Sequence, residues 1–268
     1  GQLNRNNGLG KEVLAFILVP AGHAGANKEL LHNLELPYQA VTSTDLYLTH
    51  YLNDSANDPV MNRIRAQKLR NSEEDKVKIF FVPSYLNGDD GVFNMPYYDL
   101  LVGMDLTAFP SYYEPWGYTP LESLAFKVPT ITTTLAGFGL WVKEHYNMNH
   151  PGIEVIHRED GDASNVATAI AEWVKNYTQV GETEMQKDRD NAKDVSRIAL
   201  WDNLINYYKQ AYTIALNQVS VRLKDLPANM NESVSYIEKQ LTVNNPSWVS
   251  VMIHRSIPEK LIALEELS

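Results

Sequence analysis

Residues 109–126 read FPSYYEPWGYTPLESLAF. An apolar run ends at Phe109, an aromatic loop that contains Gly117 follows, and Thr119-Pro120 has the form of a helix N-terminus. This order of strand, loop and helix predicts the carboxyl edge of a parallel sheet, which is the edge where open α/β sheets bind their ligands.

Two carboxylates flank the junction between this loop and the helix. Glu114 precedes the helix, and Glu122 falls in its predicted first turn. Carboxylates orient sugar hydroxyl groups through charge-assisted hydrogen bonds, and the free amides of a helix N-terminus favour an anion. Gly117 lets a phosphate approach the main chain. The pattern indicates a site for a sugar diphosphate, although Thr119-x-x-Glu122 also fits a capping box with a purely structural role.

The rest of the chain predicts an α/β fold. Apolar runs of strand type recur along it, at Val13–Val19, Val77–Val82, Leu106–Phe109, Thr130–Thr133 and Ile153–Ile156. Their continuous apolar character is typical of strands buried on both faces of a parallel sheet. Helix N-termini are predicted between them, at Asp58-Pro59, Asn94-Met-Pro96, Thr119-Pro120 and Ser164. Repeated βα units around a parallel sheet account for this order.

The carboxyl-terminal part of the chain has a different pattern. Residues 183–217 have helical periodicity and are expected to pack on the sheet, so that 1–217 form one lobe. Residues 218–268 contain short segments punctuated by proline and asparagine, and we interpret them as a helical tail and linker. A final apolar helix follows the capping pattern Ser256-x-x-Glu259, where a further module could begin.

Composition narrows the classes of function. The 268 residues carry 23 basic and 33 acidic side chains, a net charge of −10 that disfavours a nucleic-acid partner. Cysteine is absent, which excludes disulfides, thiolate metal sites and cysteine nucleophiles. The longest apolar run, 13–20, is too short to cross a membrane. The histidines form no H-E-x-x-H pair, so no metal is expected, and a cytoplasmic location is the default expectation.

The motif YYEPWGYTPLE, with its two glutamates eight positions apart, is followed by VPTITTTLAGFG at 128–139. Together they closely resemble the animal and fungal type of glycogen synthase, which is glycosyltransferase family 3. A looser resemblance covers roughly residues 13–216 and corresponds to the carboxyl-terminal half of that enzyme. It implies one Rossmann-like lobe of a two-lobed, GT-B-type glycosyltransferase. This lobe would hold the nucleotide sugar, and the protein's own N-terminal lobe would share the α-glucan acceptor.

The resemblance also implies a reaction and its carboxylates. Glu114 is expected beside the glucosyl ring, where it orients the hydroxyl groups, and Glu122 is expected to reach the ribose. The implied reaction is retaining transfer of glucose from UDP-glucose to the non-reducing end of an α-1,4-glucan, with no cofactor and no metal. Starch synthases that use ADP-glucose have Cys-Gly-Leu where this chain has Trp-Gly-Tyr at 116–118, which favours UDP-glucose.

Further contacts with the nucleotide sugar follow from the resemblance. Trp116 and Gly117 are expected to line the glucosyl pocket, and the backbone amides of Gly117, Tyr118 and Thr119 to hold the pyrophosphate. Tyr97 occupies the position of the family's base-stacking tyrosine and is expected to cover the uracil ring. A half-buried packing ring is the alternative interpretation of Tyr97.

The chain departs from the family pattern in two places. The family's lobe opens with a segment resembling GRYE followed by NKG, whose arginine and lysine neutralise the leaving phosphates, and residues 1–12 lack it. We therefore expect the chain alone to be inactive. The arginine cluster that binds glucose 6-phosphate in eukaryotic members is diluted by acidic residues at 184–200, so activation by that sugar is not expected.

Several alternatives stay open at this level. The residues also fit a non-catalytic glucan-binding or scaffolding module, or a UDP-sugar epimerase on the same two-lobed fold. Phe138, between Gly137 and Gly139, fits either a pocket wall or a turn. Residues 258–267 are similar to the opening helix of some bacterial α-glucan phosphorylase modules, which implies a C-terminal phosphorylase-like module in the parent chain.

Overall fold

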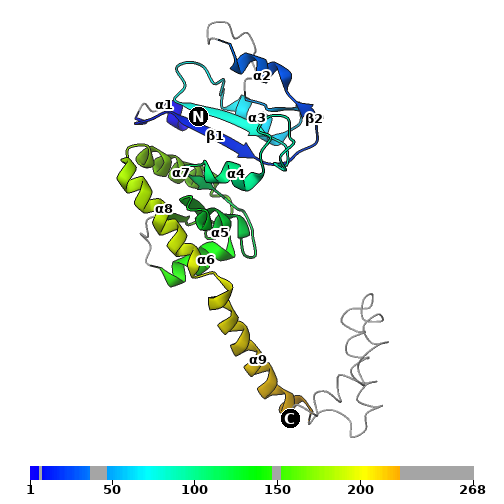
Figure 1. Ribbon diagram of the computed structural model, residues 1–268, viewed down its shortest axis with the longest axis vertical. Coiled ribbons are helices and arrows are strands. Elements are labelled where there is room, and N and C mark those ends of the chain that lie inside the picture. The colour runs from blue at the N-terminus through cyan, green and yellow to red at the C-terminus, as the bar shows by residue number, and fades with distance from the viewer. Residues whose placement is uncertain (6–7, 37–46, 147–151, 224–268) are drawn as a thin grey trace, which may run out of the picture. The chain divides into compact units, whose positions relative to one another are not determined.

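The computed structural model describes residues 1–5, 8–36, 47–146 and 152–223 (Figure 1). Its contacts divide the chain into two units, Gly1–Leu200 and Trp201–Ser268. All strands within the described residues belong to the first unit, which also carries the predicted site.

Parallel pairing dominates the first unit. Strand β1 (Val13–Leu18) pairs with β4 (Val77–Val82) along its whole length. Strands β5 (Thr107–Ala108), β6 (Thr130–Thr133) and β7 (Ile153–Ile156) form a second parallel sheet in the order β5-β6-β7. The predicted strands are all present, and the α/β class is confirmed. The strands form two sheets instead of one continuous sheet, because within the described residues no pairing joins β1 or β4 to the second group.

An antiparallel pair and a helix between β1 and β4 were not predicted from the sequence. Strand β2 (His23–Ala26) pairs with β3 (His50–Leu52), and helix α2 (Lys28–Leu34) follows β2. The side chain of Asn27 caps α2 by accepting hydrogen bonds from the first-turn amides. The segments HAGA and HYL contain no apolar run, so their pairing depends on tertiary contacts that no local pattern indicates.

The other helices of the first unit are α1 (Gln2–Arg5), α3 (Pro59–Ala66), α4 (Tyr97–Val102), α5 (Tyr118–Ala125), α6 (Gly137–His145), α7 (Ala163–Tyr177) and α8 (Glu182–Arg197). The predicted cap of α3 is confirmed, because the Asp58 carboxylate accepts a hydrogen bond from the Met61 amide at 2.8 Å.

Of two further predicted helix starts, the one at Asn94-Met-Pro96 is confirmed, since α4 begins at Tyr97, and the one at Ser164 is wrong by two residues. At α4 the N-cap is Pro96, because Asn94 has a φ of +51° and its side chain closes a turn by accepting a hydrogen bond from the Gly91 amide at 2.8 Å. At α7 the N-cap is Asp162, and Ser164 already lies inside the helix. In both cases the turn before the helix decides where the helical backbone begins.

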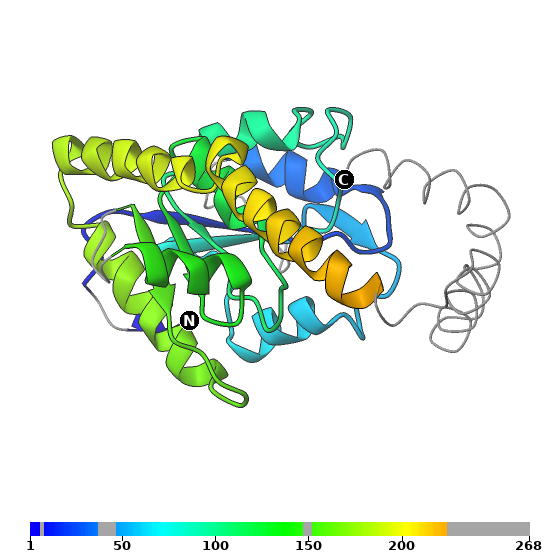
Figure 2. The same ribbon diagram turned by 90° about the horizontal axis from the view of Figure 1, so that it is seen from below.

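Helices cover both faces of the β5-β6-β7 sheet. On one face, Val166 of α7 packs against Ile131 and Ile156. On the other face, Ile153 packs with side chains of α5, α6 and α8, a cluster that includes Leu124, Phe138, Val142, Ala192 and Val195. Figure 2 shows α7 and α8 on opposite sides of this sheet. The second core of the unit lies between α3 and β4 and contains Met61, Ile64 and Phe81.

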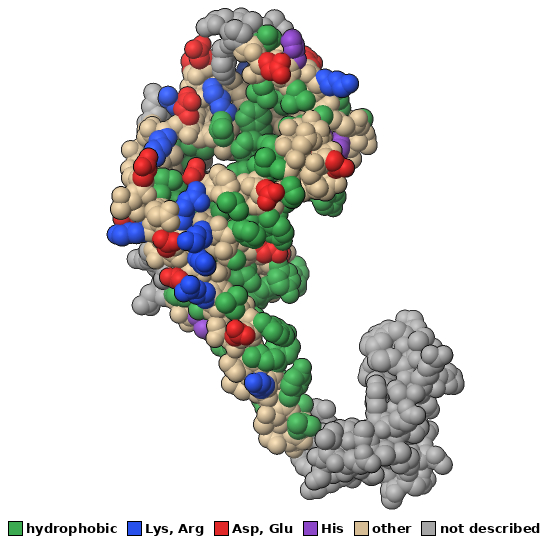
Figure 3. Space-filling model, in the orientation of Figure 1, with side chains coloured by type: hydrophobic (Ala, Val, Ile, Leu, Met, Phe, Trp, Pro, Cys, Tyr) green, Lys and Arg blue, Asp and Glu red, His purple; other side chains and the backbone are tan. Residues whose placement is uncertain are grey.

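Basic residues around α8 are paired with acidic ones. The Arg189 guanidinium lies 2.9 Å from the Asp105 carboxylate, and the Lys127 ammonium lies 2.7 Å from the Asp190 carboxylate. Figure 3 shows basic and acidic side chains interspersed over this face of the first unit. Within segment 184–200, Lys187, Arg189 and Arg197 each form an ion pair with an acidic side chain, in keeping with its mixed sequence.

The second unit begins with helix α9 (Trp201–Leu223), where the rings of Trp201 and Tyr208 lie 5.1 Å apart. The predicted lobe boundary between 217 and 218 stays a prediction, and the predicted last helix at 258–267 lies outside the described residues. Within the described part of the chain, no helix combines the length and apolar character that a membrane crossing requires.

The outer edge of β4 is closed by hydrogen bonds from outside the sheet. Its outward amides all have acceptors: Val77 donates to Asn4 Oδ1 (2.7 Å), Ile79 to Asn71 Oδ1 (2.8 Å) and Phe81 to Tyr47 O (2.6 Å). The Asn71 amide group also donates to Ile79 O at 2.8 Å. The Asn71 side chain therefore takes the place of a neighbouring strand.

We expect Asn71→Gly to lower the free energy of unfolding by about 1–3 kcal/mol, because it leaves both polar groups of Ile79 without partners. Glycine accepts the φ of +54° found at position 71, so backbone strain does not contribute to the effect. Lys68→Gly is the matched control, since Lys68 is exposed and has a φ of +55°. Urea unfolding of both variants checks this, and equal stabilities would contradict it.

Candidate functional site

The loop after β5 is held against the segment that follows β6. The Glu114 amide donates to Leu135 O at 3.1 Å, and the Gly137 amide donates to Glu114 O at 3.0 Å. The Ser111 hydroxyl donates to the Glu114 carboxylate at 3.2 Å. The carboxylate of Glu114 is therefore fixed at the carboxyl ends of two neighbouring parallel strands, as the sequence predicts.

Gly137 makes this close approach possible, and Gly139 makes a second one, between α6 and the end of β6. A Cβ at Gly137 would lie 2.1 Å from the Pro115 carbonyl oxygen, and a Cβ at Gly139 would lie 2.3 Å from the Thr133 carbonyl oxygen. No side-chain carbon fits at such distances. The loop that carries Glu114 can therefore pack on α6 only where residue 137 has no side chain, and α6 can approach the end of β6 this closely only where residue 139 has none.

Phe138 is a core residue in the first turn of α6, so neither interpretation offered for it from the sequence is correct. Its side chain is fully buried, and its ring centroid lies 5.7 Å from that of Trp116. Its amide donates to Trp116 O at 2.6 Å. Trp116 is partly buried and also contacts Trp141, with 5.7 Å between their ring centroids. Phe138 thus holds the loop in place through its contacts with Trp116.

Helix α5 starts earlier than predicted. Gly117, with a φ of +104°, is the N-cap and Tyr118 is the first helical residue. Thr119 is therefore not a cap, and Glu122 lies beyond the first turn, so the capping-box interpretation is wrong. Glycine adopts this left-handed conformation freely, and the helix begins at the residue that follows it. The predicted proximity of Glu122 to the helix start still holds.

The N-terminus of α5 presents free main-chain donors. Within the described residues, no acceptor is found for the amides of Gly117, Tyr118 and Thr119, and Pro120 has no N–H. Tyr118 and Thr119 are exposed. Aligned amides at the positive end of a helix dipole bind anions. These are the amides that the sequence analysis assigns to pyrophosphate.

Glu122 lies beside two tyrosines of α4. The Tyr98 hydroxyl is hydrogen-bonded to the Glu122 carboxylate, whose negative charge raises the pKa of Tyr98. Burial and the same carboxylate raise the pKa of Tyr97. The rings of Tyr97 and Tyr98 lie 5.3 Å apart, and Tyr98 stacks on Phe126 at 5.1 Å. The structure therefore brings the predicted residues Tyr97 and Glu122 together, through a Tyr98 that sequence reasoning did not select.

Arg158 is a second residue that the sequence analysis missed. It follows β7, its side chain is 6% exposed, and its guanidinium lies 3.9 Å from the ring centre of Tyr112. It donates to the carbonyl oxygens of Pro110 and Ser111, while its Nε has no hydrogen-bond partner. A basic residue two positions after a predicted strand was the available signal, because it falls on the same sheet edge as Glu114.

Metal ligation finds no support in the described residues, where no group of three or more histidine and acidic side chains is placed to hold an ion. The expectation that the reaction needs no metal stays a prediction.

The fold and this edge define a class of protein, an α/β unit in which a helix start with free amides lies on the chain between two carboxylates. Residues 10–259 match the family model described as glycogen synthase. This chain belongs to the glycogen synthase family.

Curated relatives from several eukaryotes are similar to this chain. Glycogen [starch] synthase isoform 1 of Saccharomyces cerevisiae is 30% identical over 174 residues, which cover 64% of this chain and 25% of the relative. Glycogen [starch] synthase of Caenorhabditis elegans is 32% identical over 195 residues, 72% of this chain and 28% of the relative. Glycogen [starch] synthase, liver, of Mus musculus is 30% identical over 171 residues, which cover 63% of this chain and 24% of the relative. The chain spans about a quarter of the length of these relatives.

We expect Arg158→Lys to lower the free energy of unfolding by about 1–3 kcal/mol, because an ammonium cannot reproduce the buried guanidinium contacts with Pro110, Ser111 and Tyr112. Arg197→Lys, at an exposed ion pair, should change it by less than about 0.5 kcal/mol. Chemical denaturation measures both. A neutral Arg158→Lys would mean that this cation does not hold the loop.

Proposed function

We propose that this chain is the nucleotide-sugar-binding lobe of a glycogen synthase. The complete enzyme would transfer glucose from UDP-glucose to the non-reducing end of an α-1,4-glucan, with retention of configuration. One observation carries the proposal beyond family membership: the unpaired amides of residues 117–119 lie on the chain between Glu114 and Glu122 at the carboxyl edge of the sheet. A diphosphate flanked by two sugars requires donors in the middle and acceptors on either side.

Each group of this edge has a role in the proposed transfer. Glu114, fixed at its main chain and held by Ser111, accepts hydrogen bonds from the glucosyl hydroxyls and favours the positive charge that develops at the anomeric carbon. The amides of 117–119 stabilise the charge that accumulates on the departing UDP. Donors and acceptors that are fixed before the reaction need no reorganisation in the transition state, which is the basis of their effect on rate.

The base and ribose are assigned to α4 and α5. Tyr97 stacks on the uracil, and Glu122 accepts a hydrogen bond from a ribose hydroxyl. The Tyr98 hydroxyl, hydrogen-bonded to Glu122, keeps that carboxylate in place. The side-by-side rings of Tyr97 and Tyr98 support this arrangement, because they bring the proposed base platform next to the proposed ribose ligand.

The proposal also includes the acceptor, the cofactors and the cellular location of the enzyme. The acceptor glucan would lie between this lobe and the protein's own N-terminal lobe, and no metal or other cofactor would take part. The location would be the cytoplasm. A phosphorylase-like module beyond 258–267 stays part of the hypothesis, on residues that the structure does not describe.

We expect UDP to bind the chain and ADP to bind more weakly, because the contacts to the base are assigned to uracil. Tyr97→Ala should weaken UDP binding by roughly 5- to 150-fold, since stacking of a base on an aromatic ring is worth about 1–3 kcal/mol. Tyr85→Ala, which removes a ring that is 77% exposed, should leave the affinity unchanged. Isothermal titration calorimetry measures all of these. Equal affinities for UDP and ADP, or none at millimolar ligand, would disprove the uridine assignment.

We expect this chain alone to incorporate glucose into glycogen at least about 10²-fold more slowly than the full-length protein. The resemblance indicates that two cationic groups for the leaving phosphates lie outside it, and loss of even one preorganised donor costs about 10²- to 10³-fold in rate. Incorporation of labelled glucose from UDP-glucose is the measurement. Equal rates would contradict the two-lobed site. An inactive full-length protein would favour a non-catalytic module, and turnover of UDP-glucose without glucan would favour an epimerase.

A further inference from the structure

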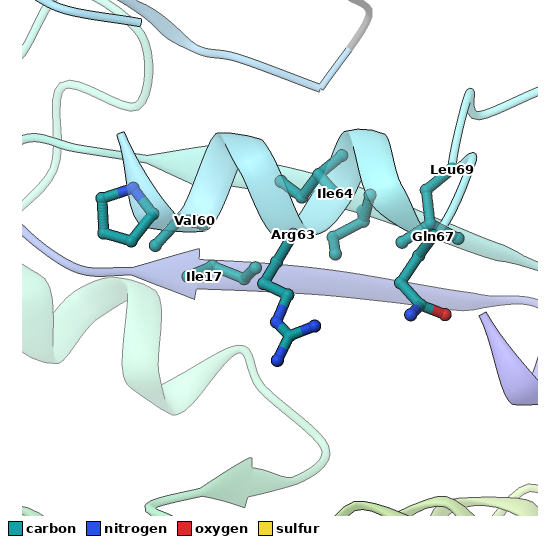
Figure 4. Close-up of a pocket in the computed structure, with 8 residues that line it drawn as sticks. Ile17, Val60, Arg63, Ile64, Gln67 and Leu69 are labelled. Atoms are coloured by element: carbon teal, nitrogen blue, oxygen red, sulfur yellow. The ribbon is translucent and has the colours of Figure 1, made fainter. Parts of the chain in front are cut away.

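Arg158 is a buried cation without an acidic partner. It is 6% exposed, and within the described residues no carboxylate forms an ion pair with it. Arg63, which extends from α3 across β1 in Figure 4, has no ion pair among the same residues either, but its side chain is exposed to water. A buried charge that no counter-charge balances lowers stability, so ion pairing does not account for a guanidinium at position 158.

The guanidinium of Arg158 contacts three consecutive residues of the loop after β5. It donates to the carbonyl oxygens of Pro110 and Ser111, the latter at 3.3 Å, and it lies 3.9 Å from the ring centre of Tyr112. A planar group with five fixed donors can bind two neighbouring carbonyls and stack on a ring at once, which an ammonium cannot do. Arg158 therefore fixes the conformation of residues 110–112.

Arg158 is itself held at its main chain. Its amide donates to the Thr134 hydroxyl at 2.9 Å, and that hydroxyl donates to the Arg158 carbonyl oxygen at 3.3 Å. Thr134 directly follows β6, whose last residue, Thr133, donates through its hydroxyl to Ser111 O at 3.0 Å. The Ser111 carbonyl thus accepts hydrogen bonds from residues at the carboxyl ends of both β6 and β7.

Ser111 connects this carbonyl to Glu114. Its hydroxyl donates to the Glu114 carboxylate at 3.2 Å, and among the described residues no other side chain is bonded to that carboxylate. The Ser111 amide donates to Phe109 O at 2.8 Å. Because both main-chain polar groups of Ser111 are bonded, the direction of its hydroxyl depends on the donors that hold its carbonyl.

We propose that Arg158 is a positioning residue for Glu114 and that it acts through Ser111. The inference rests on the proposed function, in which the Glu114 carboxylate contacts the glucosyl group. A displacement of about 1 Å at a reacting group can lower a rate by about 10²-fold, even when its cause lies outside the site. Arg158 contacts the loop and is assigned no contact with the nucleotide, so its effect should appear in turnover and not in nucleotide affinity.

Steady-state kinetics and UDP binding of the full-length protein test this separation. We expect Ser111→Ala and Arg158→Lys each to lower kcat by about 10- to 100-fold, because both displace the Glu114 carboxylate, and to change KM for UDP-glucose by less than about threefold. The affinity for UDP, measured by calorimetry, should be unchanged, because UDP has no glucosyl group and its contacts are assigned to Tyr97 and the amides of 117–119. A general loss of loop structure would weaken UDP binding as well.

A double-mutant cycle tests whether the effect of Arg158 passes through Ser111. In the Ser111→Ala background, Arg158→Lys should change kcat by less than about threefold, because the link to Glu114 is already absent. Ser111→Thr keeps a hydroxyl at this position and should keep kcat within about threefold of the wild-type value. The conservative variant thus separates loss of the hydrogen bond from any other change of the serine.

Two matched controls remove equivalent contacts elsewhere in the same unit. Ser72→Ala removes a hydroxyl that donates to the Asp75 carboxylate at 3.1 Å, in the segment before β4. Arg189→Lys removes a guanidinium of α8 that donates to the Met104 carbonyl oxygen at 3.0 Å. Neither contact leads to the loop after β5, so both variants should keep the wild-type kcat.

Three results would overturn this inference alone. They are an unchanged kcat in both single variants, a loss for Arg158→Lys that is equal with and without the Ser111 hydroxyl, and a UDP affinity that falls in parallel with kcat. A full-length wild type that transfers no glucose from UDP-glucose would instead overturn the proposed function, and this inference with it.

Discussion

The main-chain pairing of Glu114 with Leu135 and Gly137 is the constraint on which the site depends. It ties the loop after one strand to the loop after the next, and it fixes the catalytic candidate through its backbone, while Ser111 holds its carboxylate. Phe138 and Arg158 donate hydrogen bonds to main-chain carbonyl groups of the same loop. Because these contacts come from β5, β6 and β7, a parallel sheet and its connections are needed before a single carboxylate can be placed.

The sequence was sufficient for the five parallel strands and for the edge that carries the site, because continuous apolar runs and a strand–glycine–helix junction are local signals, but it did not indicate β2 and β3. It was insufficient where backbone geometry determines the first residue of a helix, or where a tertiary contact determines the neighbours of a side chain. The φ of +104° at Gly117 moved the start of α5 and removed the predicted capping box. The contact between Tyr98 and Glu122 joins residues 24 positions apart, and Arg158 lies 47 positions from the carbonyl of Ser111. The hydrophobic periodicity of a short segment does not indicate contacts between residues so far apart in the sequence.

The close approach at the start of α6 also has a consequence for inherited variation. Every missense change in a glycine codon adds a Cβ, whatever the new residue. At Gly137 and Gly139 that atom would meet a carbonyl oxygen at 2.1 and 2.3 Å. These two codons therefore have no conservative replacement, because any side chain at 137 would meet the loop that carries Glu114 and any side chain at 139 would meet the end of β6.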